Sequence, residues 1–235
     1  MSRKIKAITF DLDDTFWDVK PVIINAEMKT RKFIEDRVGT LEWGSWEDFK
    51  LIREKLILED ASYEFDVGKL RKKLLLMKIK ECVSDPEAAN ELSEKAFQLF
   101  FKERNRVDFF PNVLDEIKKL ALIYELGCLT NGNADIEIIG IDKFFEFNIS
   151  SKDVGANKPS ENHFHSAREL LGLGKDEILH IGDHKINDML GAINYGCAAL
   201  WFNPDKRVWD LKDTKKPHEF RTWKGLTEKI SSLYS

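Results

Sequence analysis

Short apolar runs, each followed by polar side chains, dominate the second half of this chain. They span Leu122 to Leu129, Phe147 to Ser150, Glu177 to Ile181 and Ala198 to Phe202, and a similar run, Ile5 to Phe10, stands alone near the N-terminus. Segments with helical periodicity separate them, at residues 113–120, 134–139, 161–171 and 188–195. Because continuous apolar runs suit strands buried on both faces, this alternation predicts an α/β fold: a parallel sheet with helices on both faces.

The stretch from residue 17 to residue 108 follows a different pattern. It is rich in charged residues, and its apolar positions, such as Phe49, Ile52 and Leu56, recur at helical spacing without a strand-like run. Ser45 and Asp85 each stand where a helix is expected to begin. The stretch is too long to be a single crossover helix between parallel strands. We therefore expect a Rossmann-like core made of residues 1–16 and 109–235, with residues 17–108 inserted as a helical domain.

Composition and charge narrow the class of partner. The 235 residues include 37 Lys and Arg against 41 Asp and Glu, for a net charge of −4, and this balance argues against nucleic acid as a partner. No apolar stretch approaches the ~20 residues of a membrane span. The three cysteines, Cys82, Cys128 and Cys197, are odd in number and widely spaced, as is typical of reduced thiols. We expect a cytoplasmic protein without a membrane or nucleic-acid partner.

Four groups of polar side chains follow the expected strands or the loops beside them. They are Asp11 with Asp13, Thr130 with Asn131, Lys158 alone, and Asp183 with Asp188. The carboxyl ends of parallel strands meet at one edge of a sheet, where ligands bind in open α/β folds. The sequence therefore predicts that these groups form one site.

The residue types suggest phosphoryl transfer assisted by a metal. Several carboxylates at one edge would repel each other unless a cation neutralises them, and oxygen ligands suit Mg²⁺. Asp11 could act as a nucleophile that forms an acyl-phosphate, and Asp13 could serve as general acid and base. Lys158 would offset negative charge on the transferring group.

The turn after the second strand supplies a phosphate cradle in this hypothesis. Thr130 offers a hydroxyl group, and Asn131 and Gly132 offer backbone N–H groups that suit phosphate oxygens.

Together these segments resemble the four motifs of the haloacid dehalogenase (HAD) superfamily. The motifs are Asp11-Leu12-Asp13-Asp14-Thr15, Leu129-Thr130-Asn131-Gly132-Asn133, Asn157-Lys158-Pro159 and Ile181-Gly182-Asp183-His184-Lys185-Ile186-Asn187-Asp188. They occur in the family's order and cover the whole core.

The resemblance implies roles that fit the chemistry above. Asp11 would be the nucleophile, Asp13 the acid and base, and Thr130 and Lys158 phosphate binders. Members of the family usually bind Mg²⁺ through the first carboxylate, the backbone carbonyl of the second and the motif-four acid. Asp183 is then the expected direct ligand, with Asp188 acting through water.

The insertion resembles the helical type of HAD cap, a lid that selects the substrate. The core segments are also similar to a bacterial branch that acts on flavin mononucleotide (FMN) and on a phosphorylated ribityl-aminouracil. We accordingly expect a small-molecule phosphate ester as substrate, for instance FMN, a riboflavin-pathway intermediate or a nucleotide. Trp17, where the chain enters the cap, could stack on a flat substrate ring or pack in a hinge.

Other functions stay open at this point. A 2-haloacid dehalogenase would use the same nucleophile on carbon, but such enzymes lack the second aspartate of the first motif and need no metal. A phosphomutase would keep every motif. A receiver-like phospho-acceptor also gathers aspartates, a Thr and a Lys, yet its phosphorylated aspartate follows a central strand of a much shorter chain. A binding protein on an inactive core would be expected to show a degraded motif, and none is degraded here.

Overall fold

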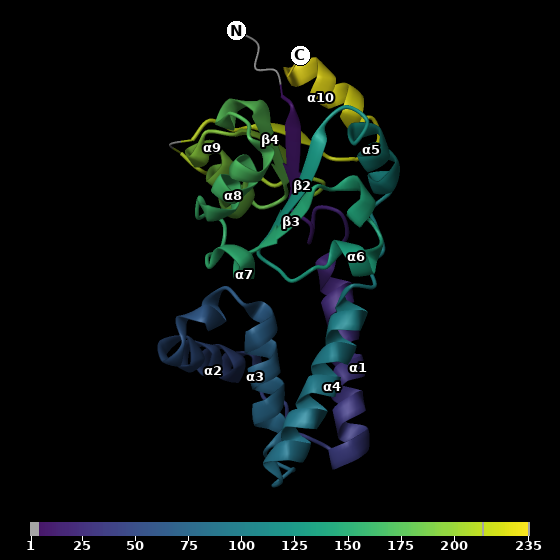
Figure 1. Cartoon of the computed structure of the whole chain (residues 1–235), viewed down its shortest axis with the longest axis vertical. Coiled ribbons are helices and arrows are strands. Elements are labelled where there is room, and N and C mark those ends of the chain that lie inside the picture. Colours follow the sequence, from purple (N-terminus) through teal and green to yellow (C-terminus); the bar gives the residue numbers. More distant parts are fainter. Residues whose placement is uncertain (1–4, 213, 235) are drawn as a thin grey trace. The chain divides into compact units, whose positions relative to one another are not determined.

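A computed structural model of the chain describes residues 5–212 and 214–234, and it divides into two compact units (Figure 1). One unit comprises Met1–Asp18 and Asp108–Ser235, and we call it the α/β unit; Val19–Val107 form the helical unit. The boundaries between the two units lie within two residues of those expected from the sequence. Residues 1–4, 213 and 235, which the expected core range includes, lie outside the described residues.

The α/β unit is built on one six-stranded sheet of order β3-β2-β1-β4-β5-β6, in which every pair of neighbours is parallel. The strands are β1 (Ala7–Phe10), β2 (Glu125–Thr130), β3 (Phe147–Ser150), β4 (Ile178–Gly182), β5 (Ala198–Phe202) and β6 (His218–Phe220). All residues of β1, β4 and β5 are buried, as expected for a sheet covered on both faces. The predicted fold class is confirmed.

Helices cover both faces of this sheet. They are α5 (Val113–Leu120), α6 (Ile136–Ile139), α7 (Ser151–Val154), α8 (Asn162–Leu171), α9 (Gly191–Tyr195) and α10 (Leu226–Tyr234). In Figure 1, α8 and α9 lie on one side of the sheet and α5 and α10 on the other. One core of buried apolar side chains, including Leu129, Phe164 and Trp201, lies on the side of α8 and α9.

The expected helix over residues 188–195 is divided in two. A π-helical turn, Lys185–Leu190, precedes α9. The imidazole Nδ1 of His184 accepts the backbone N–H groups of Ile186 and Asn187, at 3.2 and 3.0 Å. This capping contact starts the turn earlier than the apolar periodicity indicated.

The helical unit contains α1 (Val19–Val38), α2 (Trp46–Glu59), the short turn η1 (Ala61–Glu64), α3 (Val67–Ile79) and α4 (Pro86–Arg104). Both predicted helix starts are confirmed. Ser45 and Asp48 form a capping box before α2, and the carboxylate of Asp85 accepts the N–H groups of Glu87 and Ala88 at the start of α4.

The core of the helical unit involves α1, α3 and α4 far more than α2. Its buried side chains are Ile34, Leu41, Leu75, Ile79, Ala89 and Ala96. In α2 only Leu56 is buried. No helix in the described part of the chain is long and apolar enough to span a bilayer.

Candidate active site

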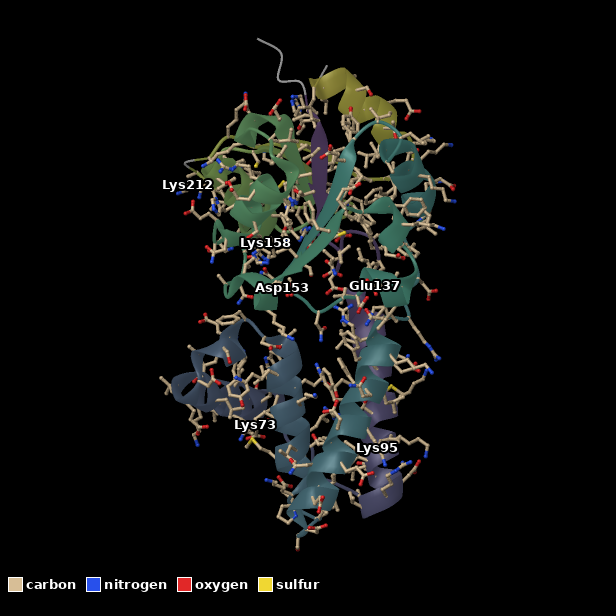
Figure 2. The ribbon with its side chains drawn as sticks, in the orientation of Figure 1. Lys73, Lys95, Glu137, Asp153, Lys158 and Lys212 are labelled. Atoms are coloured by element: carbon tan, nitrogen blue, oxygen red, sulfur yellow. The ribbon has the colours of Figure 1, made fainter. Side chains whose placement is uncertain are left out.

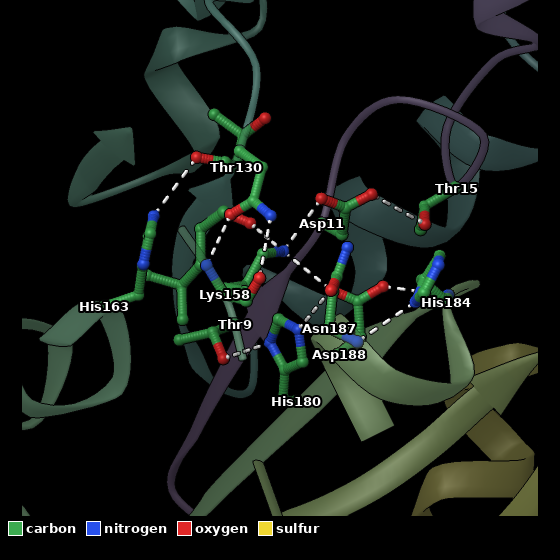
Figure 3. A network of polar contacts seen from close by, with 12 residues as sticks. Thr9, Asp11, Thr15, Thr130, Lys158, His163, His180, His184, Asn187 and Asp188 are labelled. Carbon is green, nitrogen blue, oxygen red and sulfur yellow. Dashed lines mark hydrogen bonds and ion pairs between the residues drawn. The ribbon is translucent and has the colours of Figure 1, made fainter. Parts of the chain in front are cut away.

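The four polar groups singled out in the sequence meet at the carboxyl edge of the sheet (Figure 3). Asp11 follows β1, Thr130 ends β2, and Asp183 follows β4. Lys158 lies between α7 and α8, in the connection that leaves β3. Because β3, β2, β1 and β4 are consecutive neighbours, their ends bring these residues around one small hollow of about 160 Å³.

Lys158 is the centre of the arrangement. Its ammonium group donates to Oδ1 of Asp11 at 2.9 Å, to Oδ1 of Asp188 at 2.6 Å and to the carbonyl of Leu129 at 2.5 Å. The side chain is 1% exposed. Figure 2 shows Lys158 inside the α/β unit, whereas Lys212 lies at its margin. All three donor positions of the ammonium are therefore used inside the protein.

Asn131 holds the backbone of Lys158 in place. Its Oδ1 accepts the N–H of Lys158 at 2.7 Å, and its Nδ2 donates to the Lys158 carbonyl at 3.0 Å. The side-chain hydroxyl of Ser151 also donates to Oδ1, at 3.1 Å. The amide side chain of Asn131 is thus committed to positioning Lys158. Only its backbone N–H fits the phosphate-binding role expected from the sequence.

The charges of this cluster shift one another's ionisation. Burial raises the pKa of Asp11 well above its usual value; Lys158 opposes the rise, and Asp188 and Asp183 add to it. Burial alone would lower the pKa of Lys158, but Asp11 and Asp188 outweigh it and raise the pKa. Asp188 and Asp183 repel the negative charge of Asp11, and a bound cation would reduce this repulsion.

Protein donors occupy both carboxylate oxygens of Asp188. Oδ1 takes Lys158 and Nε2 of His180, the latter at 3.3 Å, and Oδ2 takes the N–H of His184 at 2.9 Å. Burial would raise the pKa of Asp188, but Lys158 and His180 hold it below its usual value. Gly182 makes room for this carboxylate, because a Cβ there would lie 2.4 Å from its Cγ.

His180 is itself fixed from below. Its Nδ1 lies 2.9 Å from the hydroxyl of Thr9, the residue directly opposite it on the neighbouring strand. Burial lowers the pKa of His180, so the ring is neutral at pH 7. With Nδ1 accepting from Thr9, the remaining proton sits on Nε2 and is donated to Asp188. A lone polar residue inside each of these two apolar strands is the sequence signal for this contact.

Asp183 is held by a residue that the sequence analysis missed. Arg207, in the loop after β5, donates from Nη2 to the carbonyl of Asp183 at 2.7 Å and to its Oδ2 at 3.1 Å. The indole of Trp201 donates to the same carbonyl at 2.7 Å. Burial, aided by Asp188, raises the pKa of Asp183 to about 7 although Arg207 opposes the shift. Arg207 belongs to no recognisable motif, so only the folded chain reveals it.

Asp11, Asp183 and Asp188 offer oxygen atoms that all lie within 4.8 Å of one another. Three carboxylates face the ammonium group of Lys158 and the guanidinium group of Arg207 there, which leaves an excess of negative charge for a cation to offset. An all-oxygen donor set is the kind that Mg²⁺ prefers. The side chains thus fit the predicted cofactor. The Asp13 side chain is not part of this group, so its expected contribution would come from its backbone carbonyl.

Asp13 lines the hollow and is held there by Trp17. The indole Nε1 of Trp17 donates to Oδ1 of Asp13 at 3.0 Å, and its ring packs edge-on against Phe16 and Phe109. Trp17 is 0% exposed, which leaves no open ring face for a substrate. Of the two roles considered from the sequence, these contacts fit packing, together with orientation of Asp13.

Thr130 is buried at the end of β2, where its hydroxyl accepts the N–H of Gly132 at 2.9 Å and keeps its own proton free to donate. Beneath it, Nε2 of His163 lies 3.2 Å from the Thr130 carbonyl. Thr15 donates to Oδ2 of Asp11 at 3.3 Å. The carboxylate of Asp11 therefore accepts from the hydroxyl group of Thr15 at one oxygen and from the ammonium group of Lys158 at the other.

Known proteins with this sequence pattern and fold are hydrolases. Residues 5–196 match the family of haloacid dehalogenase-like hydrolases. The chain is 32% identical over 213 residues to the 5-amino-6-(5-phospho-D-ribitylamino)uracil phosphatase YigB of Escherichia coli, covering 89% of this chain and 90% of that protein. It is 31% identical over 212 residues to a glyceraldehyde 3-phosphate phosphatase of Pyrococcus abyssi, covering 86% and 83%.

A solved structure gives the same result for the fold. The crystal structure of a 2-haloacid dehalogenase from Pseudomonas syringae has a TM-score of 0.90 and 32% sequence identity, covering 97% of this chain and 99% of that one. A family match over most of the chain, with every motif at the edge of the expected sheet, identifies the class of enzyme. This chain belongs to the family of haloacid dehalogenase-like hydrolases.

Proposed function

We propose that this hydrolase is a Mg²⁺-dependent phosphomonoesterase that acts through an aspartyl-phosphate on Asp11. The observation that carries the proposal is the buried cluster in which Lys158 bridges Asp11 and Asp188, with Asp183 beside them. A second carboxylate, Asp13, follows two residues after the nucleophile. Nucleophile, charge partner, metal ligands and proton carrier would then all lie at one edge of the sheet.

In the first step, a carboxylate oxygen of Asp11 attacks phosphorus and the bond from phosphorus to the ester oxygen breaks. Asp13 gives its proton to the departing alkoxide, which leaves as an alcohol. Lys158 lies 2.9 Å from Oδ1 of Asp11 and opposes the rise in the pKa of that carboxyl group that burial causes. The Thr130 hydroxyl and the N–H of Asn131 would hold the non-bridging oxygens.

In the second step, water attacks the phosphorus of the aspartyl-phosphate. Asp13, now ionised, takes a proton from that water, and the bond between phosphorus and Asp11 breaks. Inorganic phosphate leaves, and both carboxylates return to their starting states. The contact from Trp17 to Asp13 would keep the proton carrier in one orientation through both steps.

Asp11 and Asp183, together with the Asp13 backbone carbonyl, would hold the metal. Asp188 would act on the bound ion through water, because its oxygens accept three protein hydrogen bonds, whereas those of Asp11 accept two. The ion would neutralise the excess of carboxylate charge and stabilise charge on the transferring group.

The similarity to a 2-haloacid dehalogenase from Pseudomonas syringae raises dehalogenation as a second candidate. A dehalogenase of this family would need neither Asp13 nor a group of metal-binding carboxylates. Asp11, Asp183 and Asp188 cluster in this chain, and Asp13 is present, so the geometry favours phosphate esters.

The relatives act, by their names, on a ribityl-aminouracil phosphate and on glyceraldehyde 3-phosphate. We propose a small organic phosphate of this size range as the substrate, with FMN, riboflavin-pathway phosphates and nucleotides as the first compounds to test. The helical unit, inserted directly after the first motif, would serve as the cap that selects among them.

The decisive experiment replaces Asp11 by Asn. Without a nucleophilic carboxylate the aspartyl-phosphate cannot form, so we expect release of phosphate from a generic phosphomonoester to fall by at least ~10⁴-fold. The matched control is Asp115→Asn, the same chemical change at an exposed position on α5. Hydrolysis retained in Asp11→Asn at the level of the control would contradict the mechanism.

Metal dependence is tested separately. Treatment with EDTA should abolish phosphate release, and added Mg²⁺ should restore it, whereas Ca²⁺ should restore less because it prefers more ligands at longer distances. Chloride release from 2-chloropropionate that continues in EDTA would support the dehalogenase candidate instead.

A further inference from the structure

The helical unit contains a hollow of its own, separate from the hollow around Asp11. Its volume is about 520 Å³, and side chains of α1, α2, α3 and the loop before α2 line it. Pockets that bind small molecules commonly measure about 300–1,000 Å³. The hollow exists because α2 buries only Leu56 and so leaves its aromatic side chains out of the bundle core.

The charges on the lining are strongly unequal. Four cationic side chains, Arg31, Arg53, Arg71 and Lys78, face a single carboxylate, Glu27. Glu27 pairs with both Arg71 and Arg31, and Lys78 pairs with Glu81, which lies outside this lining. The side chain of Arg53 has neither an ion pair nor a hydrogen bond to any described residue. The hollow therefore carries uncompensated positive charge.

Aromatic rings form the other part of the lining. Trp46 and Phe49 stack with centroids 5.0 Å apart and an interplanar angle of 16°, and Trp46 is 62% exposed. Arg31 lies over the ring of Trp43, 4.9 Å from its centroid, and Glu35 fixes the Trp43 indole N–H at 2.8 Å. Flat, exposed rings beside guanidinium groups recognise planar compounds by stacking and anions by charge.

An adjoining hollow of about 400 Å³ provides an internal comparison. It shares Trp43 and Phe49 with the first hollow, but its charged lining consists of Glu42, Asp48, Glu81 and Lys78. The same aromatic residues therefore border one cationic and one mainly acidic space. Loose packing of α2 alone would not separate the charges in this way.

We propose that the cationic hollow between α1, α2 and α3 binds a planar aromatic compound that carries an anionic group. Arg53 meets the anion, and the stacked pair of Trp46 and Phe49 meets the ring. This binding requires no turnover at Asp11, so it goes beyond the proposed function. The ligand is a compound separate from the substrate bound at Asp11, because one anionic group cannot meet both Arg53 and the hollow around Asp11.

The test measures binding to the full chain carrying Asp11→Asn, with Mg²⁺ present, by isothermal titration calorimetry. The probes are FMN, riboflavin as the ring without phosphate, and glycerol 3-phosphate as phosphate without a ring. FMN should bind at least tenfold more tightly than either of the other two. Equal affinity for FMN and glycerol 3-phosphate would overturn the proposal.

Two pairs of further substitutions locate the site. Arg53→Gln should weaken FMN binding about tenfold, whereas Lys55→Gln, the same loss of charge on α2 away from the hollow, should change it less than twofold. Trp46→Ala should weaken FMN but not glycerol 3-phosphate, and Leu58→Ala, at an 88% exposed position of α2, should affect neither. FMN binding that is equal in Arg53→Gln and Lys55→Gln would also overturn the proposal, provided that circular dichroism confirms folding of both.

Steady-state kinetics with Asp11 intact identify the source of the ligand. If Arg53→Gln raises KM for FMN and leaves glycerol 3-phosphate hydrolysis unchanged, Arg53 acts on the substrate itself and the proposal of a separate ligand is overturned. If Arg53→Gln loses calorimetric binding but hydrolyses FMN normally, the ligand is a separate regulator. Absence of any phosphate release would refute the proposed function, while the calorimetric comparison would still decide this inference.

Discussion

The charge cluster around Lys158 in the α/β unit and the surface ion pairs of the helical unit place the same residue types in opposite surroundings. In the α/β unit, the side chains of Lys158, Asp11 and Asp188 are 1%, 12% and 2% exposed and depend on each other. In the helical unit, ion pairs such as that between Lys95 and Glu91 are more than half exposed. Exposed pairs contribute about 0–1 kcal/mol, whereas breaking a buried pair costs about 3–5 kcal/mol. Lysine and carboxylate side chains therefore form a strongly coupled cluster where they are buried, whereas the same residue types at the surface contribute little to stability.

The largest expected effect comes from breaking the buried cluster. Lys158→Met would leave Asp11 and Asp188 without their shared cation, so we expect phosphate release to fall by at least ~10³-fold and the unfolding free energy to fall by about 3 kcal/mol. Phosphate assays and urea denaturation measure the two effects. Lys95→Met in the helical unit is the control and should change neither. Similar losses of phosphate release and of unfolding free energy in Lys158→Met and Lys95→Met would show that the buried and the exposed lysine do not differ in their contribution.

A second expected effect concerns a buried histidine under the site. Burial, with Lys158 nearby, lowers the pKa of His163 to about 4. Between pH 6.5 and pH 4 the unfolded chain therefore binds a proton that the folded chain does not, and stability falls as the pH is lowered. His163 should account for a loss of about 2 kcal/mol between pH 7 and pH 5.

His163→Gln keeps an N–H donor for the Thr130 carbonyl but cannot titrate. Urea denaturation at pH 7 and pH 5 with Mg²⁺ should show a smaller pH dependence in this variant than in the parent. The control is His165→Gln, an exposed position on the same helix. An unchanged pH dependence in His163→Gln would show that burial of this ring has no thermodynamic consequence.

A smaller effect is expected from the arginine behind Asp183. Arg207 touches both the carbonyl and the carboxylate of that residue. Its two contacts should pre-position Asp183, so Arg207→Met should raise the Mg²⁺ concentration for half-maximal activity about tenfold, with kcat restored at saturating Mg²⁺. Arg207→Lys keeps the charge without the planar fork and should be impaired as well. Tighter Mg²⁺ binding in Arg207→Met would indicate that Arg207 acts mainly by repulsion.

The smallest effect should come from the exposed pairs of the helical unit. Glu91→Gln removes one partner of Lys95 at the surface, and we expect the unfolding free energy to change by less than ~0.5 kcal/mol. Urea denaturation at low and high salt would measure it. A loss comparable to that of Lys158→Met would place this surface pair in the same class as the buried cluster.

Much of the α/β unit could be predicted from the sequence, because short segments of neighbouring residues mark both its strands and its site. Each buried strand reads as an apolar run, and each site residue follows the end of a run or the loop beside it. The observed boundaries differ where local hydrophobicity misleads. Leu122 and Ile123, assigned to a strand, are 87% and 57% exposed in the turn before β2, which begins at Glu125.

The remaining features depend on contacts between distant residues. Arg207 approaches Asp183 across 24 positions of the chain, and no spacing rule connects them. The hydrogen bond between Thr9 and His180 depends on strand register. The hollow beside α2 depends on how closely the helices pack, which hydrophobic periodicity does not specify. Shape and long-range pairing therefore had to come from the structure.

The chain leaves and re-enters the α/β unit through a paired stem. Trp17 forms a backbone bridge with Phe109, and the N–H of Phe110 donates to the carbonyl of Phe16 at 2.8 Å. Both ends of the insertion are thus tied together within the α/β unit itself. The insertion therefore starts and ends at two neighbouring positions, Trp17 and Phe109, of the α/β unit. Replacing the segment between these positions would leave the strands of the sheet in place. Grafting another insertion between these two points would keep the order and pairing of every strand in the sheet.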